Sequence, residues 1–195
     1  MIVARTIKEL RQFRRQSEGI VGFVPTMGAL HKGHLSLVSR SQACTDGTVV
    51  SIYVNPTQFN NQNDLQNYPD TFADDVEKLN AMDVDCLFVP TYDMLYPDNY
   101  SFQIEETVMS KTLCGEHRPG HFTGVLTVVL KLLNLVQADK AFFGEKDFQQ
   151  LTLVQGMVNA FFVDTQIIGC PIVREEDGLA MSSRNHNLSA ADRAR

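Results

Sequence analysis

Short apolar runs and longer amphipathic stretches alternate along most of the chain. The apolar runs are typical of buried strands, and they lie at 19–24, 48–54, 85–90, 140–144 and 165–170. The stretches between them repeat their apolar residues at helical spacing, and they lie at 6–16, 34–43, 68–82, 121–137 and 147–161. Strands that alternate with helices in this way predict βαβ units, and therefore a parallel sheet with helices on both faces.

Three further segments complete this prediction. Residues 101–106 alternate apolar and polar side chains, which predicts a strand at one edge of the sheet, and the polar residues 55–70 predict a surface loop. Ser189 is a suitable N-cap for a helix that begins with "AADRAR", and we expect further chain to continue that helix. The 195 residues are enough for one domain with a core, so we expect a single α/β, Rossmann-like domain.

The composition narrows the function classes. Hydrophobic residues make up 44% of the chain and charged residues 21%, which argues against disorder. The net charge of −6 favours neither a nucleic-acid partner nor a membrane surface, because both select a basic face. The four cysteines form no C-x-x-C, the N-terminus has charges too early for a signal peptide, and no apolar run could span a bilayer. We therefore expect a reduced, cytoplasmic protein.

Four polar segments each follow a predicted strand. They are "PTMGALHKGH" at 25–34, "NPTQF" at 55–59, "GEKDFQQ" at 144–150 and "VREEDGLAMSSRN" at 173–185. In an open parallel sheet the ligand crevice lies outside the carboxyl ends of the strands, so these four segments should meet at one rim.

The first of these segments has three interpretations. Gly28 and Gly33 permit tight turns, and the helix that begins near Gly33 points its free N–H groups at the rim, which suits phosphate. His31 and His34 could donate to a phosphate oxygen or carry positive charge there. They could instead bind a metal, although no third ligand lies close in the sequence, or they could simply be surface histidines.

The other segments carry groups that suit a polyphosphate and a small acid. Lys146 could neutralise phosphate charge, and Ser182, Ser183 and Arg184 could follow the charge of a leaving group. The amide of Gln58 could recognise hydroxyl or carboxylate groups. Each of these residues could also be an ordinary residue of a loop or a helix surface.

Four more residues are less clear from the sequence. Asp147 is a plausible N-cap, and Asp74 suits a helix dipole or a Mg²⁺ ion. Arg118 could contact a carboxylate or mark the entry to the following helix, and the sequence assigns no role to His121.

Five segments in order carry a resemblance to a known family. They are "PTMGALHKGHLSLV", "YVNPTQF", "RPGHFTGV", "FFGEKDFQQ" and "DGLAMSSRN". Together they closely resemble the pantothenate synthetase (pantoate–β-alanine ligase) family, from the first predicted strand to the end of the chain. The H-x-G-H stretch is also similar to the signature of the wider nucleotidyltransferase superfamily.

The resemblance implies a two-step reaction and a set of site residues. Pantoate and ATP give pantoyl adenylate and pyrophosphate with the help of Mg²⁺, and the amine of β-alanine then displaces AMP. ATP would be bound by Met27, Gly28, Ala29, Leu30, His31, Lys32, Gly33, His34, Gly144, Glu145, Lys146, Asp147, Val173, Met181, Ser182, Ser183 and Arg184. The resemblance also implies that His34, His31, Lys146 and Arg184 are catalytic, that Gln58 and Gln150 hold pantoate, that Gln58 borders β-alanine, and that Asp74 binds Mg²⁺.

The resemblance further implies a homodimer and a second, smaller C-terminal domain that closes over the active site. We expect residues 1–195 to form the nucleotide-binding catalytic domain without that lid. Two alternatives stay open on the sequence. One is another adenylating or nucleotidyl-transferring enzyme, and the other is a nucleotide-binding module without turnover.

Overall fold

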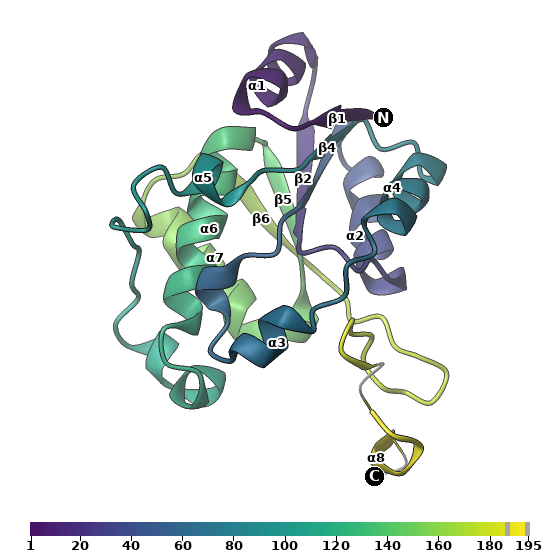
Figure 1. Ribbon diagram of the computed structural model, residues 1–195. Coiled ribbons are helices and arrows are strands. Elements are labelled where there is room, and N and C mark those ends of the chain that lie inside the picture. The colour runs from purple at the N-terminus through teal and green to yellow at the C-terminus, as the bar shows by residue number, and fades with distance from the viewer. Residues whose placement is uncertain (186–187, 194–195) are drawn as a thin grey trace.

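Six parallel strands form one sheet in the computed structural model, which describes residues 1–185 and 188–193 (Figure 1). Their order across the sheet is β1-β4-β3-β2-β5-β6, and every strand pairing is parallel. The strands are β1 Ile2–Ala4, β2 Val21–Thr26, β3 Gly47–Ile52, β4 Cys86–Phe88, β5 Lys140–Gly144 and β6 Gln166–Cys170. The predicted parallel α/β sheet is confirmed, and β1 is an edge strand that the apolar pattern did not predict.

Helices connect the strands and cover the sheet. The α-helices are α1 Ile7–Gln16, α2 Lys32–Gln42, α3 Gln62–Gln66, α4 Phe72–Ala81, α5 Tyr92–Leu95, α6 His121–Val136, α7 Phe148–Ala160 and α8 Ala190–Arg193. The 3₁₀ helices are η1 Pro56–Gln58, η2 Met109–Lys111, η3 Leu113–His117 and η4 Glu145–Asp147. The predicted helix after Ser189 appears as α8, and the rest of that prediction, residues 194 and 195, lies outside the described residues.

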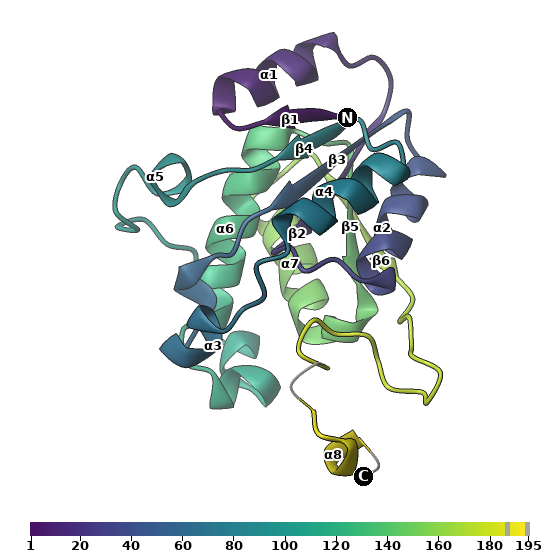
Figure 2. The same cartoon turned by 45° about the vertical axis from the view of Figure 1, so that its right-hand side comes forward.

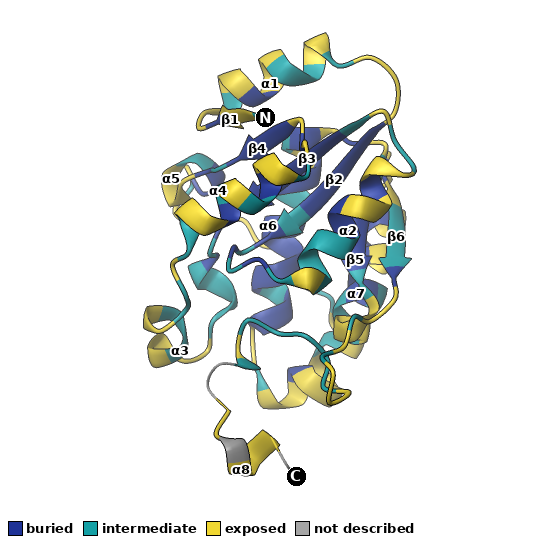
Figure 3. Ribbon diagram, turned by 90° about the vertical axis from the view of Figure 1, so that its right-hand side faces the viewer, coloured by how far each residue is buried: buried dark blue, intermediate teal, exposed yellow. Residues whose placement is uncertain are grey.

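The two faces of the sheet bury separate hydrophobic clusters (Figures 2 and 3). Successive side chains of a strand point to opposite faces, so Val49 packs with α1, α6 and α7 while Val50 packs with α2 and α4. The same alternation divides Phe143 from Phe142 on β5. A sheet that is buried on both sides in this way is fixed rigidly, and its carboxyl edge can hold the site.

One local prediction was wrong and another was incomplete. Residues 101–106 form no strand, because the sheet ends at β1 and β6 and this segment packs on α6, where the Ile104 N–H donates to Thr127 Oγ1 over 2.9 Å. The polar residues 55–70 are more ordered than a plain loop, since they contain η1 and α3. Among the described residues, no helix is long and apolar enough to cross a membrane.

Candidate active site

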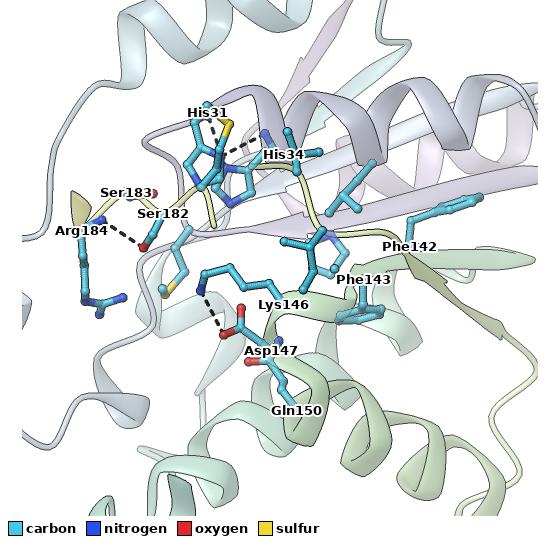
Figure 4. A pocket seen from close by; sticks show the side chains of 18 of the residues that line it. His31, His34, Phe142, Phe143, Lys146, Asp147, Gln150, Ser182, Ser183 and Arg184 are labelled. Carbon is cyan, nitrogen blue, oxygen red and sulfur yellow. Dashed lines mark hydrogen bonds and ion pairs between the residues drawn. The ribbon is translucent and has the colours of Figure 1, made fainter. Parts of the chain in front are cut away.

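Two adjoining pockets open where β2 and β5, neighbours in the sheet, end. The first, here called the basic pocket, brings together His31, His34, Lys146 and Arg184 (Figure 4). The second, the amide pocket, is lined by the side chains of Asn55, Gln58 and Gln150 and by an apolar wall from α6. The residues that line both pockets are Pro25, Met27, His34, Tyr68, Phe143, Asp147 and Gln150. The four polar segments that follow strands therefore do meet at one rim.

A buried carboxylate holds the turn that leads into the basic pocket. Gly28 and Ala29 have φ values of 80° and 50°, so the chain turns through the left-handed region here. The two oxygens of Asp75 accept the N–H groups of Ala29 and Leu30, each over 2.8 Å, and Asp75 is only 1% exposed. Lys78 Nζ donates to the Leu30 carbonyl over 2.9 Å. Asp75 thus fixes the shape of the turn.

The two histidines are held by backbone N–H groups. Gly33 N–H donates to His31 Nδ1 over 3.1 Å, and His31 N–H donates to His34 Nδ1 over 3.4 Å. Because a backbone N–H can only donate, both Nδ1 atoms act as acceptors, and each neutral ring carries its proton on Nε2. Burial, followed by the electrostatic influence of His31 and of Lys146, lowers the pKa of His34 to about 3. At neutral pH His34 therefore offers an uncharged N–H donor to a ligand, rather than a positive charge.

The lowered pKa of His34 predicts that the folded state is less stable in acid. Below pH 6.5 the unfolded chain protonates His34, whereas the folded chain does so only near pH 3, so stability falls as the pH is lowered through this window. We expect the free energy of unfolding to fall by up to about 1.4 kcal/mol per pH unit from this residue. Urea unfolding of the wild type and of His34→Gln measures this effect. The experiment covers roughly pH 7 to pH 4, because the lowered pKa of His34 changes the stability mainly in this range. Parallel pH dependences in the two proteins would contradict it.

The segment after β5 supplies the lysine of the basic pocket. Lys146 Nζ lies 3.3 Å from Asp147 Oδ1, and both side chains are partly exposed (Figure 4). Asp147 occupies the N-cap position of α7, but its side chain makes no cap hydrogen bond. The predicted N-cap position is therefore confirmed, but the predicted cap hydrogen bond is not formed. The carboxylate of Asp147 pairs with Lys146 instead. Gln150, one turn further on, lines both pockets.

The segment after β6 closes the basic pocket from the other side. Ser183 Oγ donates to the Ala29 carbonyl over 3.1 Å, which ties this segment to the turn after β2. Arg184 forms two hydrogen bonds to Asp64, of 3.1 Å and 2.9 Å, and its guanidinium lies over the rings of Phe59 and Tyr68. The rim segments are thus joined to one another by side-chain contacts.

Several of the residues expected at the nucleotide lie outside the basic pocket. Met27, His31, Gly33, His34, Gly144, Lys146, Asp147, Val173, Met181, Ser182, Ser183 and Arg184 line the basic pocket, whereas Gly28, Ala29, Leu30, Lys32 and Glu145 do not. Leu30 is in the core, and Lys32 and Glu145 are exposed. Tyr68 lines both pockets and was not singled out by sequence reasoning, because it lies in the segment that was expected to be a plain loop.

The expected metal position does not face the site. Asp74 is exposed on α4 and lines neither pocket, while its buried neighbour Asp75 is fully used in holding the turn. In the part of the chain that the structure describes, no group of three or more His, Cys, Asp or Glu side chains could hold a metal ion. Among the described residues, Asp147 is the only Asp or Glu residue that lines the two pockets, and it lines both. A single carboxylate fits a hydrated Mg²⁺ bound to phosphates, but it does not make a dedicated metal cage.

Comparisons with known proteins find similar proteins over almost the whole chain. A family model described as pantoate-beta-alanine ligase matches residues 2–195. A pantothenate synthetase from Bdellovibrio bacteriovorus is 53% identical over 191 residues, which cover 98% of this chain and 76% of the relative. One from Thermotoga neapolitana is 50% identical, over 99% of this chain and 70% of the relative. The crystal structure of the Francisella tularensis pantoate-beta-alanine ligase, complexed with beta-gamma ATP and beta-alanine, superposes with a TM-score of 0.95 at 47% identity. The superposition covers 98% of this chain and 75% of the chain in that structure.

Proposed function

The chain belongs to the pantoate–β-alanine ligase family, and from this premise we propose that its basic pocket binds ATP and its amide pocket binds pantoate. The protein is an ATP-dependent ligase that condenses pantoate with β-alanine through a pantoyl-adenylate intermediate and releases AMP and pyrophosphate. The assignment of the two pockets rests on one observation. His34, Lys146 and Arg184 line a pocket that adjoins the one lined by Gln58 and Gln150.

The basic pocket supports the first step by stabilising charge. A carboxylate oxygen of pantoate attacks the α-phosphorus of ATP, and the bond to the bridging oxygen of pyrophosphate breaks. His31 and His34 can each donate an Nε2–H to phosphate oxygens, and the nearby cations Lys146 and Arg184 can balance the charge on the leaving pyrophosphate. The chain supplies no nucleophile of its own in this scheme, because the substrate carboxylate plays that part.

The amide pocket supports the orientation of the acid. Gln58 and Gln150 offer polar contacts, and Val125, Val128 and Val129 provide an apolar wall for the two methyl groups of pantoate. Since His34, Met27 and Gln150 line both pockets, an acid bound in the amide pocket lies beside the phosphates in the basic pocket. The amine of β-alanine would then approach from the Gln58 side, attack the acyl carbon of the adenylate and release AMP.

Three further parts of the proposal extend beyond the pockets. Mg²⁺ would arrive with ATP and be held by phosphate oxygens and water, with Asp147 as the nearest carboxylate donor in the pockets and no contribution from Asp74. A homodimer is proposed from the resemblance to the family, and Val108 and Leu113, which are 72% and 73% exposed, are candidates for its interface. We also propose that residues 1–195 form the nucleotide-binding catalytic domain of a cytoplasmic enzyme.

Pyrophosphate exchange into ATP tests the assignment of substrates. With pantoate present, the protein should exchange labelled pyrophosphate into ATP, and AMP should accumulate when β-alanine is added. Acids that lack the two methyl groups should support exchange at least about 10-fold more weakly, since each lost methyl contact in an apolar pocket weakens binding several-fold. Equal exchange with unrelated carboxylates would favour another adenylating enzyme. ATP binding in calorimetry without any AMP formation would favour a nucleotide-binding module.

A further inference from the structure

The side-chain amide of Gln58 lies at the end of a buried chain of hydrogen bonds. Gln58 Oε1 accepts from Asn55 Nδ2 over 3.0 Å, and Asn55 Nδ2 also donates to the carbonyl of Gly124 on α6 over 3.2 Å. On its other side Asn55 Oδ1 accepts the hydroxyl of Tyr96 over 2.9 Å. Asn55 and Tyr96 are each 1% exposed, so water does not compete for these groups.

The direction of this chain is set at the backbone. The Gly124 carbonyl can only accept a hydrogen bond, so Asn55 must turn its Nδ2 toward it. Asn55 therefore presents the same NH₂ group to Gln58, and Gln58 can accept this hydrogen bond only with Oε1. As a result, the Gln58 Nε2 group faces the other way, 3.2 Å from the sulfur of Met27, a residue that lines both pockets.

Tyr96 holds the acceptor end of the asparagine in place. Its ring is packed against those of Tyr92 and Tyr100, with centroids 4.9 Å and 5.2 Å away, and Lys131 Nζ lies 4.8 Å above it. Burial raises the pKa of Tyr96 to about 12, so its hydroxyl stays protonated and can donate. The hydroxyl of Thr57 also donates to Asn55 Oδ1, over 3.0 Å, and completes the support of the amide.

The backbone of Gln58 is fixed against the same helix. His121 Nδ1 lies 2.8 Å from the Gln58 carbonyl, and because a carbonyl only accepts, the ring carries its proton on Nδ1. Gly124 allows the close approach of η1, since a Cβ at this position would lie 2.5 Å from the Thr57 carbonyl oxygen. These contacts give His121 a structural role that the sequence left unassigned.

We propose that Asn55 and Tyr96 are positioning residues that set the polarity of Gln58, so that Gln58 meets the acid substrate only as an N–H donor. The group of the substrate that Gln58 recognises is then an acceptor oxygen, such as a carboxylate oxygen, and not a hydroxyl that donates. This inference rests on the proposed function, because it takes the amide pocket as the site of the acid. It excludes a substrate hydroxyl that donates to Gln58, which is one of the roles that the amide chemistry of Gln58 alone left open.

Asn55→Asp tests the polarity directly. The new carboxylate has no N–H for Gln58 Oε1, so Gln58 must turn its Nε2 toward it and present Oε1 to the substrate. We expect the KM for pantoate in the exchange reaction to rise at least about 30-fold, because an acceptor then faces an acceptor. The dissociation constant of ATP, measured by calorimetry, should stay within about threefold of wild type, since its pocket is untouched.

Tyr96→Phe tests the same proposal with a smaller change. It removes one hydroxyl and keeps the packed ring, and we expect the KM for pantoate to rise roughly 5- to 10-fold with kcat nearly unchanged, as for one lost hydrogen bond. Tyr92→Phe is the matched control, because it removes a hydroxyl from the neighbouring ring on α5 without touching Asn55. Its KM should stay within about twofold of wild type.

The outcomes separate this inference from the proposed function. A wild-type protein without pantoate-dependent exchange would overturn the proposed function itself. Pantoate-dependent exchange in the wild type together with an unchanged KM in Asn55→Asp would overturn the polarity of Gln58 alone. If Asn55→Asp does not fold, equal KM values in Tyr96→Phe and Tyr92→Phe would overturn it equally well, and a rise confined to Tyr96→Phe would support it.

Discussion

His34→Ala is expected to lower the rate of pantoyl-adenylate formation at least about 100-fold, the scale of removing one donor that stabilises developing charge. His34 lines both pockets, and its Nδ1 accepts the backbone N–H of His31, so its Nε2–H remains for the ligand. In the proposed function this donor lies where the attacking carboxylate and the phosphates meet, and the substitution removes it. Pyrophosphate exchange in the presence of saturating pantoate measures the rate of this step.

His117→Ala is the matched control for this prediction. His117 is exposed on η3 and lines neither pocket, so the same chemical change there should leave the exchange rate within about twofold of wild type. Thermal unfolding of both variants shows whether the fold is kept. An exchange rate in His34→Ala within about threefold of wild type would contradict the role given to this histidine.

Lys146→Ala is expected to have an effect of the same size, again at least about 100-fold in exchange rate. The ammonium group is a compact positive charge 3.3 Å from the carboxylate of Asp147, and both residues line the basic pocket. If ATP binds as proposed, the substitution removes a cation that balances the charge on pyrophosphate, and it leaves the Asp147 carboxylate unbalanced beside the phosphates. The KM for ATP should rise together with the loss in rate, and steady-state kinetics measures both.

A surface ion pair of the same kind provides the comparison. Lys111 lies 3.2 Å from Glu105, and both side chains are more than half exposed, so Lys111→Ala removes an equivalent pair outside the two pockets. That change should have little effect on exchange, because exposed ion pairs contribute at most about 1 kcal/mol even to stability. A normal exchange rate in Lys146→Ala would place this lysine away from the phosphates during the reaction.

Much of the fold follows from the periodicity of the sequence. Long segments such as α6 and α7 repeat apolar residues over several turns, and the runs that form β2, β3 and β5 are mostly apolar. Short elements do not have this redundancy. The three residues of β1 cannot show a period, and the alternation of residues 101–106 is satisfied by packing on α6 rather than by pairing in the sheet.

Some features of the site could also be predicted from the sequence, whereas others depend on tertiary packing. The rule that ligands bind beyond the carboxyl ends of strands was enough to place His34, Lys146 and Gln58 around adjoining pockets. The sequence could not show which of Asp74 and Asp75 is buried beside the site. Neighbouring helix residues point about 100° apart, and the rotation of α4 about its axis depends on tertiary packing. Tyr96 was missed because its contact with Asn55 joins positions 41 residues apart.

The strand order has a consequence for how the protein is made. Gly22 of β2 pairs with Lys140 of β5, and the pockets lie where these two strands end. During synthesis β2 and β3 can pair early. The other neighbour of β2, which is β5, becomes available only after most of the chain has left the ribosome. Pairings between distant segments form slowly, because loop-closure entropy must be overcome before any contact is gained. A nascent chain that stops before β5 would therefore expose one edge of β2 and would lack the parts of both pockets that β5 and later segments supply. An unpaired strand edge of this kind is prone to aggregation.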